Sequence, residues 1–198
     1  IFVRQRERGM DPQTTHCLTH SLRRSGYTTA LLGKWHLGFQ TEYNPVHHGF
    51  DMFHGYVSGN VDYHSHVDNL GYKDWWHNET QIDEEGYVTD LINEHAVQFI
   101  RDNRSRPFFL YVAHEAPHWP YQGRNDKADR FPGRNDFPAR GTRTDCKAAY
   151  KEMIEAMDDG VGMILDTLRA TGLDENTLVV FSSDNGPVRE VGSSGGLR

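Results

Sequence analysis

Three groups of polar residues each come directly after an apolar run that is typical of a buried strand. Lys34 and His36 follow residues 27–32, His118 follows residues 108–113, and Asp184 with Asn185 follows residues 178–183. Ligands of open α/β sheets bind outside the carboxyl ends of the strands. If the three strands are parallel neighbours, we expect these side chains to line one cleft.

Lys34 and His36 lie in the stretch Gly33–Gly38, which reads GKWHLG. An ammonium group and an imidazole two residues apart can bind one anion, and the imidazole can also carry a proton. The alternative is a solvated loop. We favour the anion site because Trp35 and Leu37 should anchor the loop and fix both side chains.

His118 stands between Pro117 and Trp119, and Pro120 follows. Two prolines stiffen this segment, and a rigid histidine at a strand end suits a general acid. His114, in the same segment, could be structural or could contact a substrate.

Asp184 and Asn185 offer a carboxylate and an amide oxygen side by side. Such ligands suit a hard divalent cation such as calcium or magnesium. Asp-Asn-Gly is also ordinary turn chemistry, and the local sequence weighs the two alternatives about equally.

A cluster of possible zinc ligands occurs at residues 62–68, where two histidines and two aspartates alternate with other residues. The ligands are Asp62, His64, His66 and Asp68. Their spacing is not a standard zinc spacing, so we prefer a loop that lines the cleft.

Strands and helices alternate along the chain. We expect helices at residues 15–25, 89–103 and 144–171, and strands at residues 27–32, 108–113 and 178–183, the last two buried on both faces. We expect Gly160 and Gly162 to let the last helix pack closely on a sheet. This alternation predicts an α/β fold with a mainly parallel sheet and helices on both faces.

Two long stretches show no clean period. Residues 39–85 read as an elaborated, ordered loop rich in aromatic residues, and residues 120–143 read as a polar surface loop rich in arginine. The stretches 56–76 and 124–143 could shape subsites for a sugar, or they could be packing and solvated surface. The sequence does not favour either alternative.

The composition bounds the function. The 198 residues are 36% hydrophobic, which is enough for a core, and the formal net charge is −7. An acidic balance argues against a nucleic-acid partner, although a local pocket can still bind an anion. No apolar run is long enough to span a membrane. Two cysteines, Cys17 and Cys146, are too few for a disulfide framework.

The chain resembles the sulfatase family, the arylsulfatase-like branch of the alkaline-phosphatase-like fold. GKWHLG together with Ser183–Gly186 (SDNG) is a specific combination. Further matching stretches stand in the family's order: residues 26–30, 49–51, 62–66, 89–92, 107–111 and 116–120.

The resemblance implies a role for each candidate. Lys34 and Ser65 would bind the sulfate group. His36 would hydrogen-bond the nucleophile, and His118 would act as general acid at the bridging oxygen. Asp184 and Asn185 would be two ligands of a calcium ion that polarises the sulfate.

The family's formylglycine nucleophile arises from a Cys- or Ser-x-Pro-x-Arg motif, which neither cysteine of this chain fits. We therefore expect residues 1–198 to be the central part of one sulfatase catalytic domain, with the nucleophile, further calcium ligands and a second lysine outside the chain, and expect the chain alone to be inactive. The expected reaction is hydrolysis of a sulfated sugar or aryl sulfate.

Two other functions stay open: a phosphoesterase or phosphonate hydrolase of the same fold, and a protein that binds sulfated glycans without catalysis. The resemblance suggests a periplasmic, secreted or lysosomal protein. The oligomeric state cannot be read from the sequence.

Overall fold

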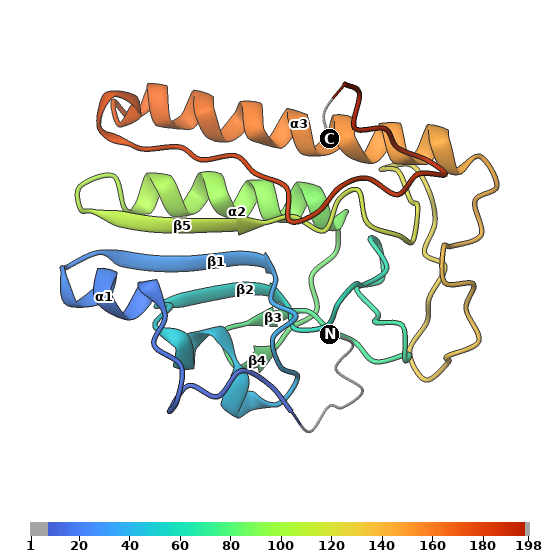
Figure 1. Cartoon of the computed structure of the whole chain (residues 1–198), viewed down its shortest axis with the longest axis horizontal. Coiled ribbons are helices and arrows are strands. Elements are labelled where there is room, and N and C mark those ends of the chain that lie inside the picture. The colour runs from blue at the N-terminus through green and yellow to red at the C-terminus, as the bar shows by residue number, and fades with distance from the viewer. Residues whose placement is uncertain (1–7, 197–198) are drawn as a thin grey trace.

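The computed structural model describes residues 8–196. Its centre is a five-stranded sheet of order β4-β3-β2-β1-β5 (Figure 1). The strands are β1 (Thr28–Lys34), β2 (Met52–Tyr56), β3 (Trp76–His77), β4 (Thr80–Gln81) and β5 (Phe108–Ala113). β1 is central and pairs in parallel with both β2 and β5. The short strands β3 and β4 add an antiparallel edge. The prediction of a mainly parallel sheet is therefore confirmed.

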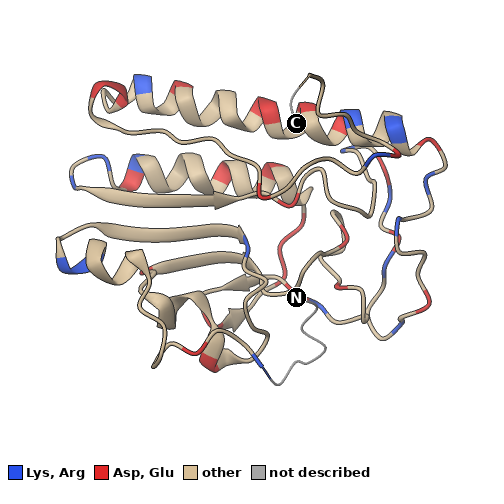
Figure 2. Ribbon diagram, viewed as in Figure 1, with Lys and Arg blue, Asp and Glu red and all other residues tan. Residues whose placement is uncertain are grey.

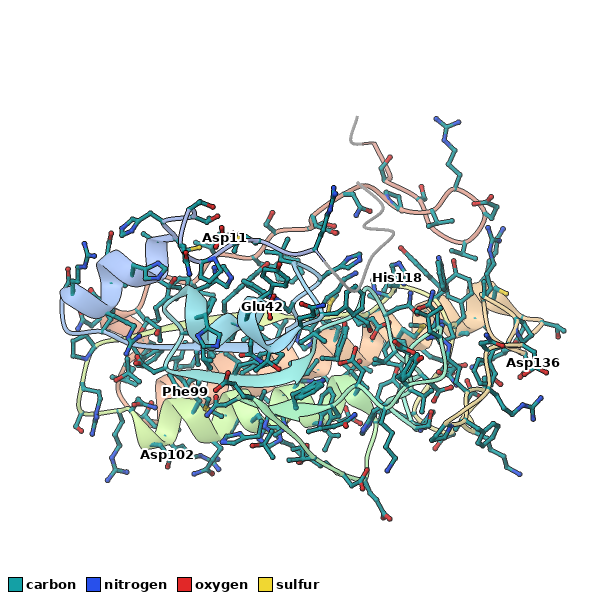
Figure 3. The ribbon with its side chains drawn as sticks, turned by 90° about the horizontal axis from the view of Figure 1, so that it is seen from below. Asp11, Glu42, Phe99, Asp102, His118 and Asp136 are labelled. Atoms are coloured by element: carbon teal, nitrogen blue, oxygen red, sulfur yellow. The ribbon has the colours of Figure 1, made fainter. Side chains whose placement is uncertain are left out.

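Three α-helices among the described residues accompany the sheet: α1 (Leu18–Arg24), α2 (Val88–Asp102) and α3 (Cys146–Ala170). α2 packs on one face of the sheet, and α3 packs along α2. α1 contacts β1, and the short 3-10 turn η2 (Pro45–His48) contacts β2. Figure 3, seen from below, places α1 and α2 on opposite sides of the strands. Two further 3-10 turns are η1 (Thr41–Tyr43) and η3 (Asp174–Asn176). None of the described helices is long and apolar enough to cross a membrane.

Two apolar clusters fill the two sides of the sheet. The larger contains Leu32, Tyr56, Ile92 and Met153 and lies between the sheet, α2 and α3. The smaller contains Leu31, Phe53 and Trp35 on the other face. Side chains alternate across a strand, so neighbours in β1 reach different clusters. Lys34, two residues after Leu32, is therefore on the α2 face.

The stretch 39–85 is not the loop that the sequence predicts, because it contains β2, β3 and β4. β2 reads MFHGY, and its histidine and glycine hide the apolar pattern of a strand. Gly55 is required by close packing. A Cβ atom there would lie 2.1 Å from the carbonyl oxygen of Gly33 in β1.

The predicted strand at residues 178–183 is wrong for the described chain. These residues pair with no strand within residues 8–196, and Leu178 and Phe181 are 90% and 71% exposed. The apolar run alone cannot provide a pairing partner. β5 is consequently an edge strand, and Tyr111 is 52% exposed, so the prediction that β5 is buried on both faces is also wrong.

Gly160 packs on a helix and not on the sheet. A Cβ atom there would lie 1.9 Å from the Nδ2 atom of Asn93 in α2, whereas nothing lies within 4 Å of a Cβ atom at Gly162. Gly160 thus lets α3 approach α2 closely, along the main contact between α3 and the other helices and strands.

The loop of residues 120–143 is more than a polar surface loop. Tyr121, Gln122 and Arg130 are each 1% exposed. Ion pairs fasten the rest: Arg124 with Asp90 and Asp159 (2.8 and 2.6 Å), and Arg143 with three carboxylates. Figure 2 shows basic and acidic residues alternating along this loop. The arginines serve packing, which favours the packing alternative for residues 124–143 over a sugar subsite.

Candidate active site

Lys34, His36 and His118 lie together at the carboxyl ends of β1 and β5. Gly33 and Ala113 are register partners, so the segments that follow them start side by side. The positive charge of Lys34 reaches both imidazoles and Glu115, since it lowers the pKa of all three. In Figure 3, His118 lies away from Asp102, which ends α2 at the other end of the sheet. This part of the predicted convergence is present in the structure.

Buried contacts of Trp35 fix the stretch after β1. Its Nε1 atom donates to the Tyr43 carbonyl oxygen at 2.8 Å, and its backbone N–H donates to Tyr56. Leu37 is 44% exposed, so the expectation that it anchors the loop is wrong.

His36 has a φ angle of 56° in the left-handed region, which is uncommon for residues other than glycine. Its backbone N–H donates to the Val57 carbonyl oxygen at 3.2 Å. A Cβ atom at Gly59 would lie 2.6 Å from its Nε2 atom, so the ring packs against Gly59. The backbone and Gly59 together orient the imidazole, which agrees with a defined role at the site.

The surroundings of both imidazoles disfavour the protonated form. Burial lowers the pKa of His36, and the charge of Lys34 lowers it further. Burial likewise lowers the pKa of His118, and the charges of Lys34, His36 and Arg130 add to the effect. The Nδ1 atom of His118 lies 2.6 Å from the Trp119 carbonyl oxygen. Because that oxygen can only accept, Nδ1 carries a proton and Nε2 is free for a ligand.

Glu115 and Arg130 also belong to this cluster, although no sequence motif assigns them to it. Glu115 is 4% exposed and accepts the Val61 N–H at 3.1 and 3.3 Å. Burial raises the pKa of Glu115, while the charges of Lys34 and Arg130 oppose that rise. The Nη2 atom of Arg130 is buried without a hydrogen-bond partner. The position of Arg130 beside the cluster is visible only in the tertiary fold. Glu115 has a signal in the sequence, because it lies between His114 and His118 in the stretch HEAPH.

Asp62 organises the loops beside this cluster. Its two carboxylate oxygens accept the backbone N–H groups of His64, Ser65, Asp129 and Arg130 and the side-chain amide of Gln122, at 2.7 to 3.0 Å. These bonds lower the pKa of Asp62 in spite of its burial. The carboxylate thereby joins the 62–66 turn to the 122–130 loop.

Ser65 lies in that turn. Its Oγ atom is buried and has no hydrogen-bond partner among the described atoms. The Tyr63 hydroxyl donates to the His118 carbonyl oxygen at 3.0 Å, which ties the turn to the catalytic candidates. A free hydroxyl at this place can donate to a bound anion.

The zinc ligands considered at residues 62–68 do not form a site. His64 bonds the Gly123 carbonyl oxygen, whereas His66 bonds that of Gly86. His66 also stacks on Trp75, and His64 on Tyr87. These contacts give both histidines a structural role, and the preferred interpretation, a loop that lines the cleft, stays a prediction.

Two further candidates have contrasting surroundings. The ring nitrogens of His114 are buried without hydrogen-bond partners in the described structure, and burial lowers its pKa to about 4. Asp184 and Asn185 are exposed and follow no strand. Within residues 8–196, no hydrogen bond or ion pair joins them to Lys34, His36 or His118, so the third part of the predicted convergence stays a prediction.

A hollow of about 310 Å³ has Val57 in its wall. Asp68, Lys73 and Trp76 are among the residues that line it. None of the candidate catalytic side chains lines this hollow, so it does not define the active site.

Cys17 and Cys146 are both free thiols.

Comparison with known proteins identifies the class of protein. The sequence profile of the family named Sulfatase matches residues 3–197. N-acetylgalactosamine-6-sulfatase of Mus musculus is 33% identical over 199 residues, which cover 93% of this chain and 35% of that protein. Arylsulfatase J of Mus musculus is 30% identical over a match that covers 92% of this chain and 31% of that protein. The chain therefore belongs to the sulfatase family, the sulfuric ester hydrolases.

A solved structure supports the fold. Ps i-CgsB, determined in complex with k-i-k-neocarrahexaose, superposes with a TM-score of 0.66 at 26% identity, over 83% of this chain and 38% of that one. The predicted alkaline-phosphatase-like α/β fold is confirmed, and the chain represents part of it. The chain spans about a third of the length of the curated relatives named above.

Proposed function

We propose that residues 1–198 are the central part of a catalytic domain that hydrolyses sulfate esters. The observation that carries the proposal is the joint position of Lys34, His36 and His118 at the carboxyl ends of two parallel strands. The relatives named N-acetylgalactosamine-6-sulfatase and arylsulfatase support a sulfate ester of a sugar or aryl group as substrate. A periplasmic, secreted or lysosomal location is part of the same proposal.

Each side chain has a role in this proposal. The Lys34 ammonium and the Ser65 hydroxyl donate to sulfate oxygens. His118, once protonated on Nε2, gives that proton to the bridging oxygen as its bond to sulfur breaks. His36 donates to the nucleophile, which we place outside this chain as a formylglycine. The negative charge of the ester favours protonation of the imidazoles, which opposes the effects of burial and Lys34.

A calcium ion is part of the proposal. The carboxylate of Asp184 and the amide oxygen of Asn185 are hard oxygen donors, so they fit calcium in kind. Calcium takes 6–8 oxygen ligands, so we place the remaining ligands outside residues 1–198. When bound, the ion would supply Lewis-acid polarisation of the sulfate.

Substitution of Lys34 tests the proposal in a longer protein that also carries the nucleophile. Lys34→Ala should lower kcat/KM on an aryl sulfate by about 100-fold or more, because the sulfate loses a charged hydrogen-bond donor. Lys73→Ala is the matched control, since the Lys73 ammonium pairs with Asp83 away from the site. Near-normal kcat/KM in Lys34→Ala with an unchanged circular dichroism spectrum would refute the proposed role.

Two further assays separate the alternatives. We expect the 198-residue chain alone to release no sulfate from an aryl sulfate in the presence of calcium, even in a single turnover. The longer protein should prefer sulfate over phosphate monoesters. A preference for phosphate would indicate the phosphoesterase, and glycan binding without turnover of either ester would indicate the non-catalytic protein.

A further inference from the structure

Three side chains meet on the α2 face of the sheet and have no part in the proposed sulfate site. His54 comes from β2, His95 from α2, and Glu84 from the segment between β4 and α2. The Nε2 atoms of both histidines lie 2.9 Å from Glu84, one at each carboxylate oxygen. The two imidazole rings are 3.7 Å apart between centroids. Their candidate ligand atoms all lie within 4.8 Å of one another.

The ligand types suit a particular class of metal ion. Two imidazole nitrogens and one carboxylate form a His₂Glu set, which binds zinc in known proteins. Calcium and magnesium prefer oxygen ligands, so this set selects against them. We propose that His54, Glu84 and His95 bind a zinc-class divalent cation, at a site separate from the calcium ligands Asp184 and Asn185.

Outer contacts already hold the ligands in place. The Trp75 Nε1 atom donates to the Glu84 Oε2 atom at 2.7 Å. The Nδ1 atom of His77 lies 3.4 Å from the Nδ1 atom of His54. With a metal on Nε2, the Nδ1–H group of His54 can donate to His77. Metal-binding histidines usually have such a partner at the second ring nitrogen.

His54 is the buried ligand of the set, with 6% of its side chain exposed. The alternative is a metal-free structure, in which Glu84 accepts an N–H from each ring. Access is available, because the side chains of Glu84 and His95 are 27% and 26% exposed.

Zinc titration of the metal-free chain tests the proposal. After dialysis against a chelator, calorimetry should show one Zn²⁺ bound per chain, and excess Ca²⁺ should not displace it. Co²⁺ bound in its place should give the strong visible absorption of a four-coordinate site. No zinc binding by the folded chain, or a Co²⁺ spectrum of the hexaaqua ion, would overturn the proposal.

Variants locate the binding. Glu84→Gln keeps the shape of the side chain, and His95→Ala removes a partly exposed ring, so at least one variant should fold. Each should weaken Zn²⁺ binding by more than about 100-fold, since loss of an outer partner alone costs about 10–100-fold. His77→Ala should cost about 10–100-fold. Circular dichroism identifies any variant that loses its fold.

Two controls exclude other ligands. His47 and Glu79 form an exposed pair with the same 2.9 Å separation but no second histidine, so His47→Ala should leave the affinity unchanged. Cys17 lies 3.9 Å from His48 and could bind zinc by itself. Cys17→Ser should likewise leave the affinity unchanged. A loss of zinc binding in Cys17→Ser, with normal binding in Glu84→Gln and His95→Ala, would overturn the assignment.

Discussion

At the scale of single residues, the charge of Lys34 adds to the effect of burial on the pKa of its neighbours. It lowers the pKa of His36 and of His118, after the larger effect of burial. The lowered pKa values and the nearby lysine suit the binding of an anion, whose negative charge would oppose both effects.

Removal of the Lys34 charge should change the pKa of the two neighbouring histidines in a known direction. In Lys34→Met, the pKa of His36 and His118 should rise, because a positive charge disfavours the imidazolium form. A titration of the imidazole resonances by NMR measures both values. Lys73→Met should leave them unchanged, since Lys73 pairs with Asp83 elsewhere. Unchanged or lower values in Lys34→Met would contradict the proximity that the structure gives these groups.

The positions of Lys34 and His118 could be predicted from the sequence because the ends of the preceding strands can be recognised there. The apolar run before Lys34 and the one before His118 both indicate strands, and parallel pairing then brings their ends together. Glu115 and Arg130 were missed for a physical reason. Their burial depends on contacts with Val61 and Asp62, far away in the chain, and no local pattern encodes such contacts.

At the scale of elements, the two glycines of α3 have opposite surroundings. Gly160 faces Asn93 of α2 so closely that no Cβ atom fits, whereas Gly162 faces open space. Helix propensity treats both glycines alike, at about 1 kcal/mol less favourable than alanine. Only the packing of α3 on α2 distinguishes them, which explains why the sequence alone could not assign their roles.

Alanine at each position gives a matched pair of variants. Gly162→Ala should raise the free energy of unfolding by about 0.5–1 kcal/mol through helix propensity. Gly160→Ala should lower it by about 1–3 kcal/mol, because the added methyl group displaces Asn93 and separates the helices. Urea denaturation measures both. Equal stabilisation by the two substitutions would show that the close contact between α3 and α2 is absent in solution.

At the scale of the whole molecule, β2 and the stretch 178–183 show opposite failures of sequence reasoning. β2 is a buried strand whose histidine and glycine conceal it, and tertiary packing against β1 defines it. The stretch 178–183 has the composition of a buried strand, yet it is exposed and unpaired within the described residues. Composition indicates what a segment can do, while its neighbours decide whether it does so.

The exposed stretch and the edge strand β5 suggest a pairing in a longer chain. A strand that follows β5 and α3 would reach a parallel position beside β5 by a right-handed crossover, the usual connection. Such a pairing would bury Leu178 and Phe181 and would carry Asp184 to the sheet end that holds Lys34 and His118. We therefore expect the convergence predicted for all three polar groups to be completed when further chain is present.

Hydrogen exchange measures that pairing. In the 198-residue chain, the backbone amides of residues 178–183 should exchange rapidly, because the segment is exposed and unpaired. In a protein extended beyond residue 198, the same amides and those of β5 should exchange more slowly, by up to about 100-fold, as expected for paired strands. The amides of β1, paired on both sides in either protein, are the internal control. Rapid exchange of residues 178–183 in the longer protein as well would refute the pairing, and with it the predicted place of Asp184 beside the sulfate.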